Sequence, residues 1–267
     1  MLGQSVLGFT MVELARFSFA LTPRMRAFIE LRDGLRCLER ARQCDQPYAW
    51  LLAACDVRAS LLGEHGRKPA VPELMALLAS MRTHLTKLVK NHPEYQGKIL
   101  EACDMIEKYI ESMRLSVQDA MDFFCEDALL GNYLNALKKQ DLLAHKPTLP
   151  QGLGLLWSSS KHKDMLSDSL HDLHAAVTHL DIMLNDFVGW EKRIADSGAD
   201  QIVPERGVEY GLLVLGLDTA SVQQGIVPEC SGNRHAIRVR FQQWQAGEAA
   251  CDVEDNLLYY SMMVPIG

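Results

Sequence analysis

The chain has 267 residues, of which 48% are hydrophobic and 23% are charged, as in ordinary globular proteins. Its formal net charge is −7, so we expect no general attraction to nucleic acid or anionic lipid. No apolar run approaches the length of about eighteen residues that marks a membrane span, so no membrane partner is predicted. The seven cysteines include no C-x-x-C pair, which favours reduced thiols in a cytoplasm.

The first predicted elements are an extension, a strand and a helix. Residues 1–11 do not resemble a secretory signal, because the first ten carry no Lys or Arg. Residues 11–20 mix aromatic and polar side chains and suit a short strand. A helix then begins with Thr22 as N-cap and Pro23 at its first position. Its outer face is basic and carries Arg24, Arg26, Arg32, Arg36, Arg40 and Arg42.

Apolar residues at helical spacing continue through the first half of the chain. They predict helices over residues 47–64, 72–90 and 99–113, and a shorter helical piece over 134–143. Ser116, with Asp119 three residues later, predicts the start of a separate helix, because this spacing forms a capping box. The loop over 65–72 contains Arg67.

A segment rich in Pro, Gly and Ser over residues 146–160 marks the clearest boundary. The longest predicted helix follows over 161–197, with Gly198 as the residue after its end. Its apolar stripe keeps steps of four and three residues and is wider than a single partner helix requires. This width favours a bundle core with one edge left for a second subunit.

From residue 202 the apolar period changes from helical to strand-like. Residues 208–217 are apolar on both faces and predict a central strand. Residues 257–264 form another apolar run of strand length. The acidic segment over 248–256 between the predicted strands is expected to be a loop.

The segment 225–241 combines a predicted turn with a predicted strand. Pro228, Gly232 and Asn233 favour the turn. The strand alternates, with Ile237, Val239 and Phe241 on one face and Arg234, Arg238 and Arg240 on the other. No carboxylate is expected between these arginines. The arginine face is either solvated or a docking surface for carboxylates, and this segment alone favours a solvated face.

No sequence motif for catalysis or phosphate binding is present. One cluster combines His171, His174 and His179 with Asp168, Asp172 and Asp181. A metal site there would need ligands from a second helix, so solvated side chains are the preferred interpretation. We therefore predict no metal, no cofactor and no enzymatic activity.

These patterns predict an α+β protein, with a mostly helical bundle domain and a small antiparallel β domain. After the extension at 1–11, the helical domain is predicted to cover residues 21–200. The β domain combines residues 12–20 with residues 201–267.

Two segments and one helix together resemble a known family. Residues 17–29 read F-S-F-A-L-T-P-R-M-R-A-F-I, and residues 225–229 read G-I-V-P-E before a basic residue and the strand ending V-R-F. In this order, with the long helix between them, they resemble the family of the cell-division protein ZapD. Its members crosslink filaments of the tubulin-like GTPase FtsZ, and the resemblance covers about residues 12–264.

The resemblance implies a cytoplasmic homodimer at the division site, with an α-helical and a β domain in each subunit. It implies a basic pocket that binds the acidic and apolar C-terminal tail of FtsZ. Arg26 and Arg240 match family positions, Arg234 matches a basic position, and Arg67 lies in a loop where members place a basic residue. Arg238 joins these candidates because it shares the face of Arg240.

The chain departs from the family pattern at two places. Glu30 stands where a basic residue is usual. The family's central Gly-Gly and Asp-Leu-Pro stretch is reduced to Leu149-Pro150 within residues 145–150. The resemblance therefore leaves open a different pocket shape and a different tail sequence.

Two other classes of function remain. The first is a non-enzymatic nucleic-acid or acidic-peptide binding module that uses the arginine face. Net charge and the lack of aromatic residues beside the arginines argue against nucleic acid. The second is an enzyme with a histidine-based site, for which no constellation is visible.

Overall fold

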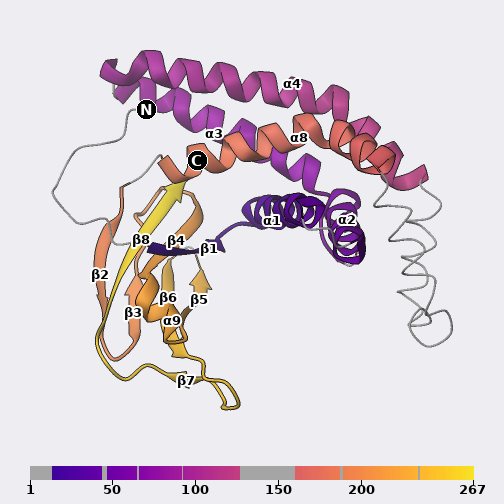
Figure 1. Ribbon diagram of the computed structural model, residues 1–267. Helices are drawn as coiled ribbons and strands as arrows, with labels where there is room; N and C mark the ends of the chain where they lie inside the picture. The colour runs from indigo at the N-terminus through magenta and orange to yellow at the C-terminus, as the bar shows by residue number, and fades with distance from the viewer. Residues whose placement is uncertain are drawn as a thin grey trace. The chain divides into compact units, whose positions relative to one another are not determined.

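The computed structural model describes residues 14–43, 47–64, 66–91, 93–126, 160–186, 189–233 and 235–267 (Figure 1). The chain divides into two compact units. The β unit comprises Met1–Thr22 and Asp186–Pro265, and the helical unit comprises Pro23–Asn185 and Ile266–Gly267. One unit is built mainly from antiparallel strands and the other from helices, which confirms the predicted α+β class.

The helical unit contains long helices with buried apolar stripes. They are α1 (Pro23–Gln43), α2 (Pro47–Leu62), α3 (Ala70–Asn91), α4 (Gln96–Glu126) and α8 (Ser160–Asp186), with the short 3₁₀ helix η1 (Pro93–Tyr95) before α4. Helix α1 packs against α2 and α3, and α3 packs against α4 (Figure 1). Phe28, Leu31, Trp50, Leu61 and Leu74 are almost fully buried and supply much of this core.

Helix α4 corrects one sequence prediction. A separate helix was expected to start at Ser116, but α4 runs without a break from Gln96 to Glu126. Its buried stripe includes Cys103, Ile106 and Met113, and α4 packs along α3. The capping signal at Ser116 therefore lies inside a helix that is already formed before it. The predictions for residues 134–143 and for the boundary over 146–160 fall almost entirely outside the described residues.

Helix α8 is present but ends at Asp186, so the predicted helix to residue 197 is wrong in its last part. Strand β2 (Glu191–Ala195) follows, because pairing with the C-terminal strand overrides local helix propensity there. Ser197 and Gly198 both have positive φ, 48° and 68°, and connect β2 to β3 (Ala199–Ile202) as a tight hairpin. The boundary between the units therefore lies near residue 186 instead of residue 200.

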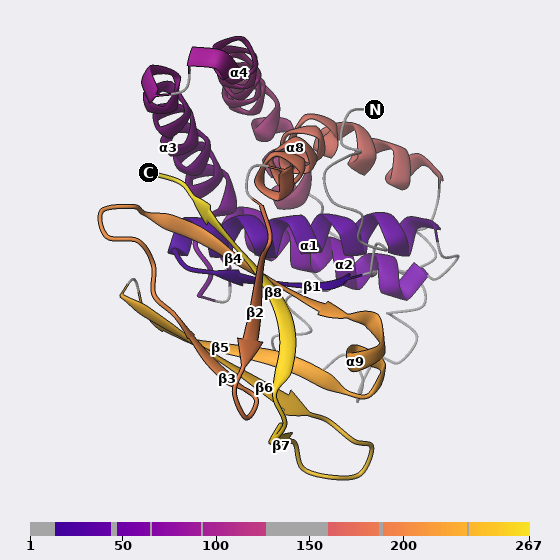
Figure 2. The same cartoon turned by 90° about the vertical axis from the view of Figure 1, so that its left-hand side faces the viewer.

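The β unit contains two antiparallel sheets (Figure 2). The first sheet has the strand order β1-β4-β8-β2, in which β1 is Leu14–Ala20, β4 is Tyr210–Asp218 and β8 is Leu257–Pro265. The second has the order β3-β6-β5, with β5 at Ile226–Asn233 and β6 at Ala236–Gln243. The short strand β7 (Cys251–Asp252) pairs with β6, and helix α9 (Thr219–Gln223) links β4 to β5.

The core of the β unit joins residues of both sheets. Leu213, Leu215 and Leu217 of β4 cluster with the buried residues of β6 and with Tyr259 of β8. The rings of Phe241 and Tyr259 lie 5.0 Å apart between centroids. Strand β4 is buried on both faces, as its continuous apolar sequence predicts.

A polar network crosses the same core. The Asp200 carboxylate on β3 accepts a hydrogen bond of 2.6 Å from the Tyr259 hydroxyl on β8. It also accepts one of 2.9 Å from the Arg193 Nε on β2. Because β2 and β8 belong to one sheet and β3 to the other, this carboxylate ties the sheets together.

Candidate functional site

Strand β6 presents the two described arginines of the predicted arginine face. Ile237, Val239 and Phe241 are buried, whereas Arg238 and Arg240 between them are exposed. This alternation follows from the strand period of two, which turns successive side chains to opposite faces of a sheet. Neither arginine forms an ion pair within the part of the chain that the structure describes. Arg234 lies outside the described residues, so its place on this face stays a prediction.

The segment before β6 is a strand, not the predicted turn. Strand β5 pairs with β6 along its whole length, and Pro228 is accommodated because β5 lies at the edge of its sheet. The register sets Glu229 directly opposite Arg240, with both side chains exposed. The expectation of a face without a carboxylate is therefore wrong. Pro228, Gly232 and Asn233 favour a turn locally, but pairing with β6 gives this segment the conformation of a strand.

The arginine face extends further than the sequence analysis recognised. The backbone N–H of Trp244 donates a hydrogen bond of 2.9 Å to the Gly225 carbonyl, which continues the β6 pairing one step past Gln243. Trp244 has the same parity as Arg240 and Gln242, and it is 58% exposed. Extending the period-two alternation by one step would have revealed it. Trp244 therefore corrects the expectation that no aromatic residue lies beside the arginines on this face.

Other strands supply the polar neighbours of β6 on this face. Ser231 and Gln201 flank Arg238, Ala199 lies beside Arg240, and Asp252 of β7 lies opposite Gln242. We call this exposed surface of the second sheet, from Arg238 to Trp244, the outer strip. It is cationic at one end, aromatic at the other, and bordered by two carboxylates.

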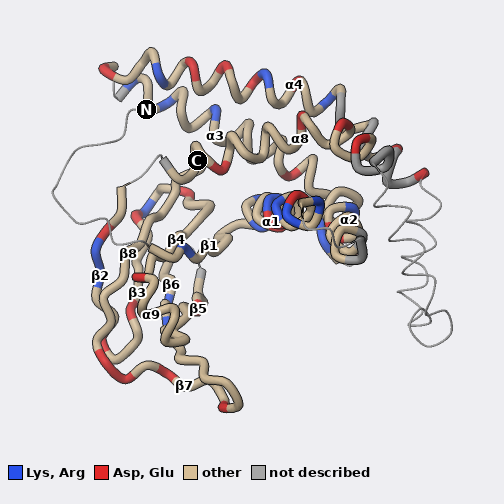
Figure 3. Tube along the Cα trace, in the orientation of Figure 1, with Lys and Arg blue, Asp and Glu red and all other residues tan. Residues whose placement is uncertain are grey.

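Helix α1 carries the candidate Arg26, which is exposed. Figure 3 shows several Lys and Arg positions along α1. Other arginines of α1 have structural roles. Arg32 Nη1 donates a 3.0 Å hydrogen bond to the Asp181 carboxylate of α8, and Arg36 Nη2 donates one of 2.6 Å to its other oxygen. Burial disfavours the charged form of Arg32, but the carboxylates of Asp33 and Asp181 outweigh this and raise its pKa.

The candidate Arg67 is engaged within the helical unit. Its guanidinium donates to the Asp56 carboxylate and to the Ser60 hydroxyl, each at 2.8 Å, and to the Asp56 backbone carbonyl at 3.3 Å. These contacts hold the loop after α2 against that helix. These contacts explain the position of Arg67 without a binding partner, so Arg67 is a weaker candidate for the binding site than the exposed arginines.

The four described candidate arginines divide between the units. Arg26 and Arg67 belong to the helical unit, and Arg238 and Arg240 to the β unit. The positions of Arg26 and Arg67 are described relative to the helical unit, and those of Arg238 and Arg240 relative to the β unit. A single pocket containing all of them therefore stays a prediction of the family resemblance.

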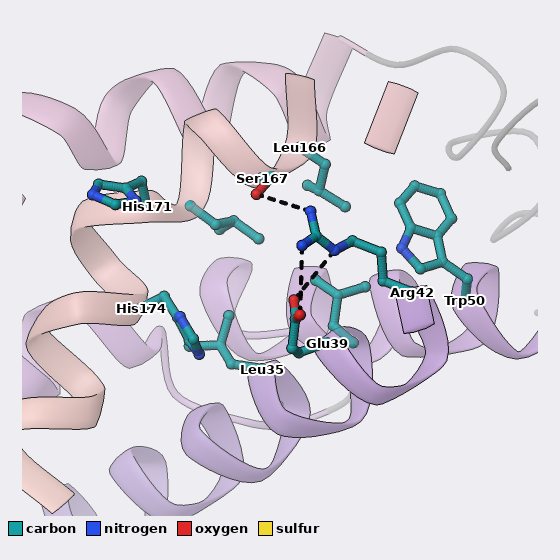
Figure 4. Close-up of a pocket in the computed structure, with 10 residues that line it drawn as sticks. Leu35, Glu39, Arg42, Trp50, Leu166, Ser167, His171 and His174 are labelled. Carbon is teal, nitrogen blue, oxygen red and sulfur yellow. Dashed lines mark hydrogen bonds and ion pairs between the residues drawn. The ribbon is translucent and has the colours of Figure 1, made fainter. Parts of the chain in front are cut away.

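The helical unit also contains a small pocket that the sequence analysis missed (Figure 4). Its volume is about 80 Å³, and α1, α2 and α8 line it with Leu35, Leu38, Glu39, Arg42, Trp50, Leu166, Ser167, Leu170, His171 and His174. At its rim the Arg42 guanidinium lies 3.3 Å from the Glu39 carboxylate and donates to the Ser167 hydroxyl. Because the Glu39 carboxylate neutralises the charge of Arg42, this residue has little remaining attraction for an anion.

The histidine cluster on α8 does not converge on one point. His171 and His174 line the pocket, whereas the ring of His179 lies 5.2 Å from the Tyr109 ring. Across the described ranges, no group of three or more His, Cys, Asp or Glu side chains could hold a metal ion.

Three titratable groups near the outer strip, Asp200, Tyr259 and Cys230, are at least partly buried. Burial opposes ionisation of Asp200, but hydrogen bonds from Tyr259 and Arg193 outweigh it and lower the pKa of its carboxyl. Burial and the Asp200 carboxylate raise the pKa of Tyr259. Burial raises the pKa of the Cys230 thiol on β5 to about 12, so this thiol is not a nucleophile at neutral pH.

No protein-family model matches the chain, and no curated protein matches it. In the described part of the chain, none of the helices combines the length and apolar character required to cross a bilayer.

Proposed function

We propose that this protein is a non-enzymatic cell-division factor that binds the C-terminal tail of FtsZ and crosslinks FtsZ filaments. It acts in the cytoplasm at the division site, as a homodimer, and promotes assembly of the division ring. The proposal rests on the ordered resemblance of residues 17–29 and 225–241 to the ZapD family.

One structural observation carries the binding mechanism. Arg238 and Arg240 are exposed side by side on β6 and form no ion pair with the described residues. Their Cα atoms are about 6.6 Å apart at the strand rise of about 3.3 Å per residue. Guanidinium groups bind carboxylates bidentately, so this pair suits two acidic side chains of an extended tail.

The alternative of a nucleic-acid module is supported by Trp244, because exposed aromatic rings stack on bases. Glu229 and Asp252 border the same strip, and the net charge of the chain is −7. Both features oppose a polyanion more than a short acidic peptide, so we prefer the peptide.

The test is sedimentation of the protein with polymerised FtsZ, together with affinity for the isolated FtsZ tail peptide. Arg240→Gln should weaken tail binding by about one to two decades, because a charge-assisted hydrogen bond contributes about 1.5–3 kcal/mol. Glutamine is used because Arg240→Glu would also oppose Glu229 with a like charge. Binding should weaken with added salt.

Two variants calibrate this experiment. Arg206→Gln removes another exposed arginine of the β unit and should leave affinity unchanged. Glu229→Gln removes the carboxylate opposite Arg240 and should strengthen binding. Absence of co-sedimentation for the wild-type protein, in a buffer where FtsZ is polymerised, would reject the proposed function.

A further inference from the structure

We infer that the outer strip selects an acidic peptide that also carries an apolar side chain, and that Trp244 is the residue that reads this apolar side chain. This inference rests on the proposed function and deepens it, because it assigns a second contact to the same binding surface. It begins from the geometry of one strand.

The two ends of the outer strip differ in chemistry. Arg238 and Arg240 are exposed and uncommitted at one end, and Trp244 is 58% exposed at the other. At about 3.3 Å per residue, Trp244 lies roughly 13 Å from Arg240 and 20 Å from Arg238 along the strand. An extended peptide lying along β6 has the same rise. Its apolar residue must therefore stand four to six residues from its acidic residues.

The middle of the strip sets a further requirement. Asp252 is exposed on β7 opposite Gln242, between the arginines and Trp244. A carboxylate in the centre of the peptide would face this like charge. The preferred peptide is therefore acidic at one end, neutral in the middle and apolar at the other end.

The backbone at Trp244 is held in place by Gly225. Its backbone N–H donates a hydrogen bond to the Gly225 carbonyl. Gly225 has a positive φ of 87°, and the two backbone segments lie close together there. A Cβ atom at Gly225 would lie 2.1 Å from the Trp244 carbonyl oxygen, which only glycine avoids. The backbone under the indole is thus fixed while the side chain stays accessible. Because the backbone is already held, a ligand that contacts the exposed indole causes little further loss of backbone freedom.

The experiment uses two fluorescently labelled ten-residue peptides in an anisotropy titration. The first carries two glutamates separated by one Ser, then three Ser or Gly residues and one Phe, so that both glutamates and the Phe point to one face of the extended peptide. In the second peptide, Ser replaces the Phe. Trp244→Ala should weaken binding of the Phe peptide by roughly three- to tenfold, the range of an aromatic pair. The same variant should leave the Ser peptide unchanged. Trp244→Phe should bind nearly as the wild type does.

Three further measurements complete the test. Leu115→Ala removes the exposed leucine of α4, which is 76% exposed, and should change neither titration. Moving the Phe next to the glutamates should abolish its contribution. A single-stranded oligothymidylate of the same length should bind more weakly than the Phe peptide.

Each result separates the inference from the proposed function. Equal affinity of Trp244→Ala and wild type for the Phe peptide overturns the inference, and FtsZ sedimentation can still succeed. Tighter binding of the oligonucleotide than of either peptide overturns it in favour of nucleic acid. If the Phe–Trp244 coupling is observed but FtsZ does not co-sediment, the strip is a peptide site and the proposed function fails.

Discussion

Asp200 is a single residue on which the joining of the two sheets depends. Its carboxylate accepts hydrogen bonds from Tyr259 and Arg193 on strands of the opposite sheet. Tyr259 is fully buried, so its hydroxyl depends on this acceptor. Ala199 and Gln201, the neighbours of Asp200 on β3, pair with Arg240 and Arg238 of the outer strip. The network therefore supports the proposed binding face from the inside.

Asp200→Asn should lower the free energy of unfolding at pH 7 by about 1–3 kcal/mol, the usual contribution of hydrogen bonds to a charged group. The folded protein lowers the pKa of Asp200 below its ordinary value of 3.8. The stabilisation is therefore complete well above pH 3.8 and is lost as the pH falls through the lower folded pKa. Urea unfolding at pH 7 and thermal unfolding from pH 7 to pH 3 measure both effects.

Asp196→Asn is the control, because Asp196 is an exposed residue of the same hairpin. Its stability should match that of the wild type within about 0.5 kcal/mol. A stability difference for Asp200→Asn that does not shrink in acid would contradict the role given to the ionised carboxylate.

At the scale of elements, α1 and α8 are joined by charged as well as apolar groups. Arg32 and Asp181 are each only 8% exposed, and they pair across the two helices. Arg36 binds the same carboxylate but is half exposed. In the ion pair between Arg82 of α3 and Glu107 of α4, both side chains are about half exposed, which offers a comparison.

Asp181→Asn should lower the free energy of unfolding by about 1.5–3 kcal/mol, because it removes the carboxylate that binds both Arg32 and Arg36, while Asp33 still pairs with Arg32. The double variant Arg32→Met with Asp181→Leu should recover most of this loss, since apolar groups can replace a buried pair. Arg82→Gln should cost less than about 1 kcal/mol. Urea denaturation of all three variants tests this ranking, and equal losses for Asp181→Asn and Arg82→Gln would refute it.

The success of sequence analysis depended on how local each signal was. Strands β4, β6 and β8 and the long helices follow from their own apolar periods. Strands β2 and β5 do not, because β5 contains Pro228 and turn residues, and each acquires its conformation from a partner strand. The same limit applies to the site.

Candidate residues were predicted only as far as their local pattern allowed. The outward direction of Arg238 and Arg240 followed from alternation. The contacts of Arg67 with Asp56 and Ser60 did not, since nothing in the loop sequence marks its acceptors. The pocket beside Arg42 joins α8 to α1 and α2, which lie much earlier in the chain, so no single segment could reveal it.

At the scale of the whole molecule, crosslinking requires two tail-binding sites. A monomer with one outer strip would coat filaments without joining them. On α8, Met165 and Ile182 are about half exposed, but single exposed apolar residues are common, so the dimer edge on this helix stays a prediction.

Light scattering at tens of micromolar should give the mass of two chains. Arg240→Gln should remain dimeric but fail to bundle FtsZ, because the substitution lies on the outer strip. This outcome would separate assembly from tail binding. A monomer mass for the wild type across this concentration range would remove the crosslinking model.

The order of the strands along the chain also determines when the β unit can form during synthesis. Strand β1 is an edge strand whose partner is β4, and the helical unit lies between them in the sequence. At about 5–20 residues per second, a ribosome needs roughly 10–40 s to proceed from Ala20 to Tyr210. During that interval β1 has no strand to pair with, while the helices from α1 onward can already collapse. The nascent protein therefore carries β1 as an unpaired strand ahead of the helical unit, and chaperone contact or misassembly between neighbouring nascent chains should begin at this strand.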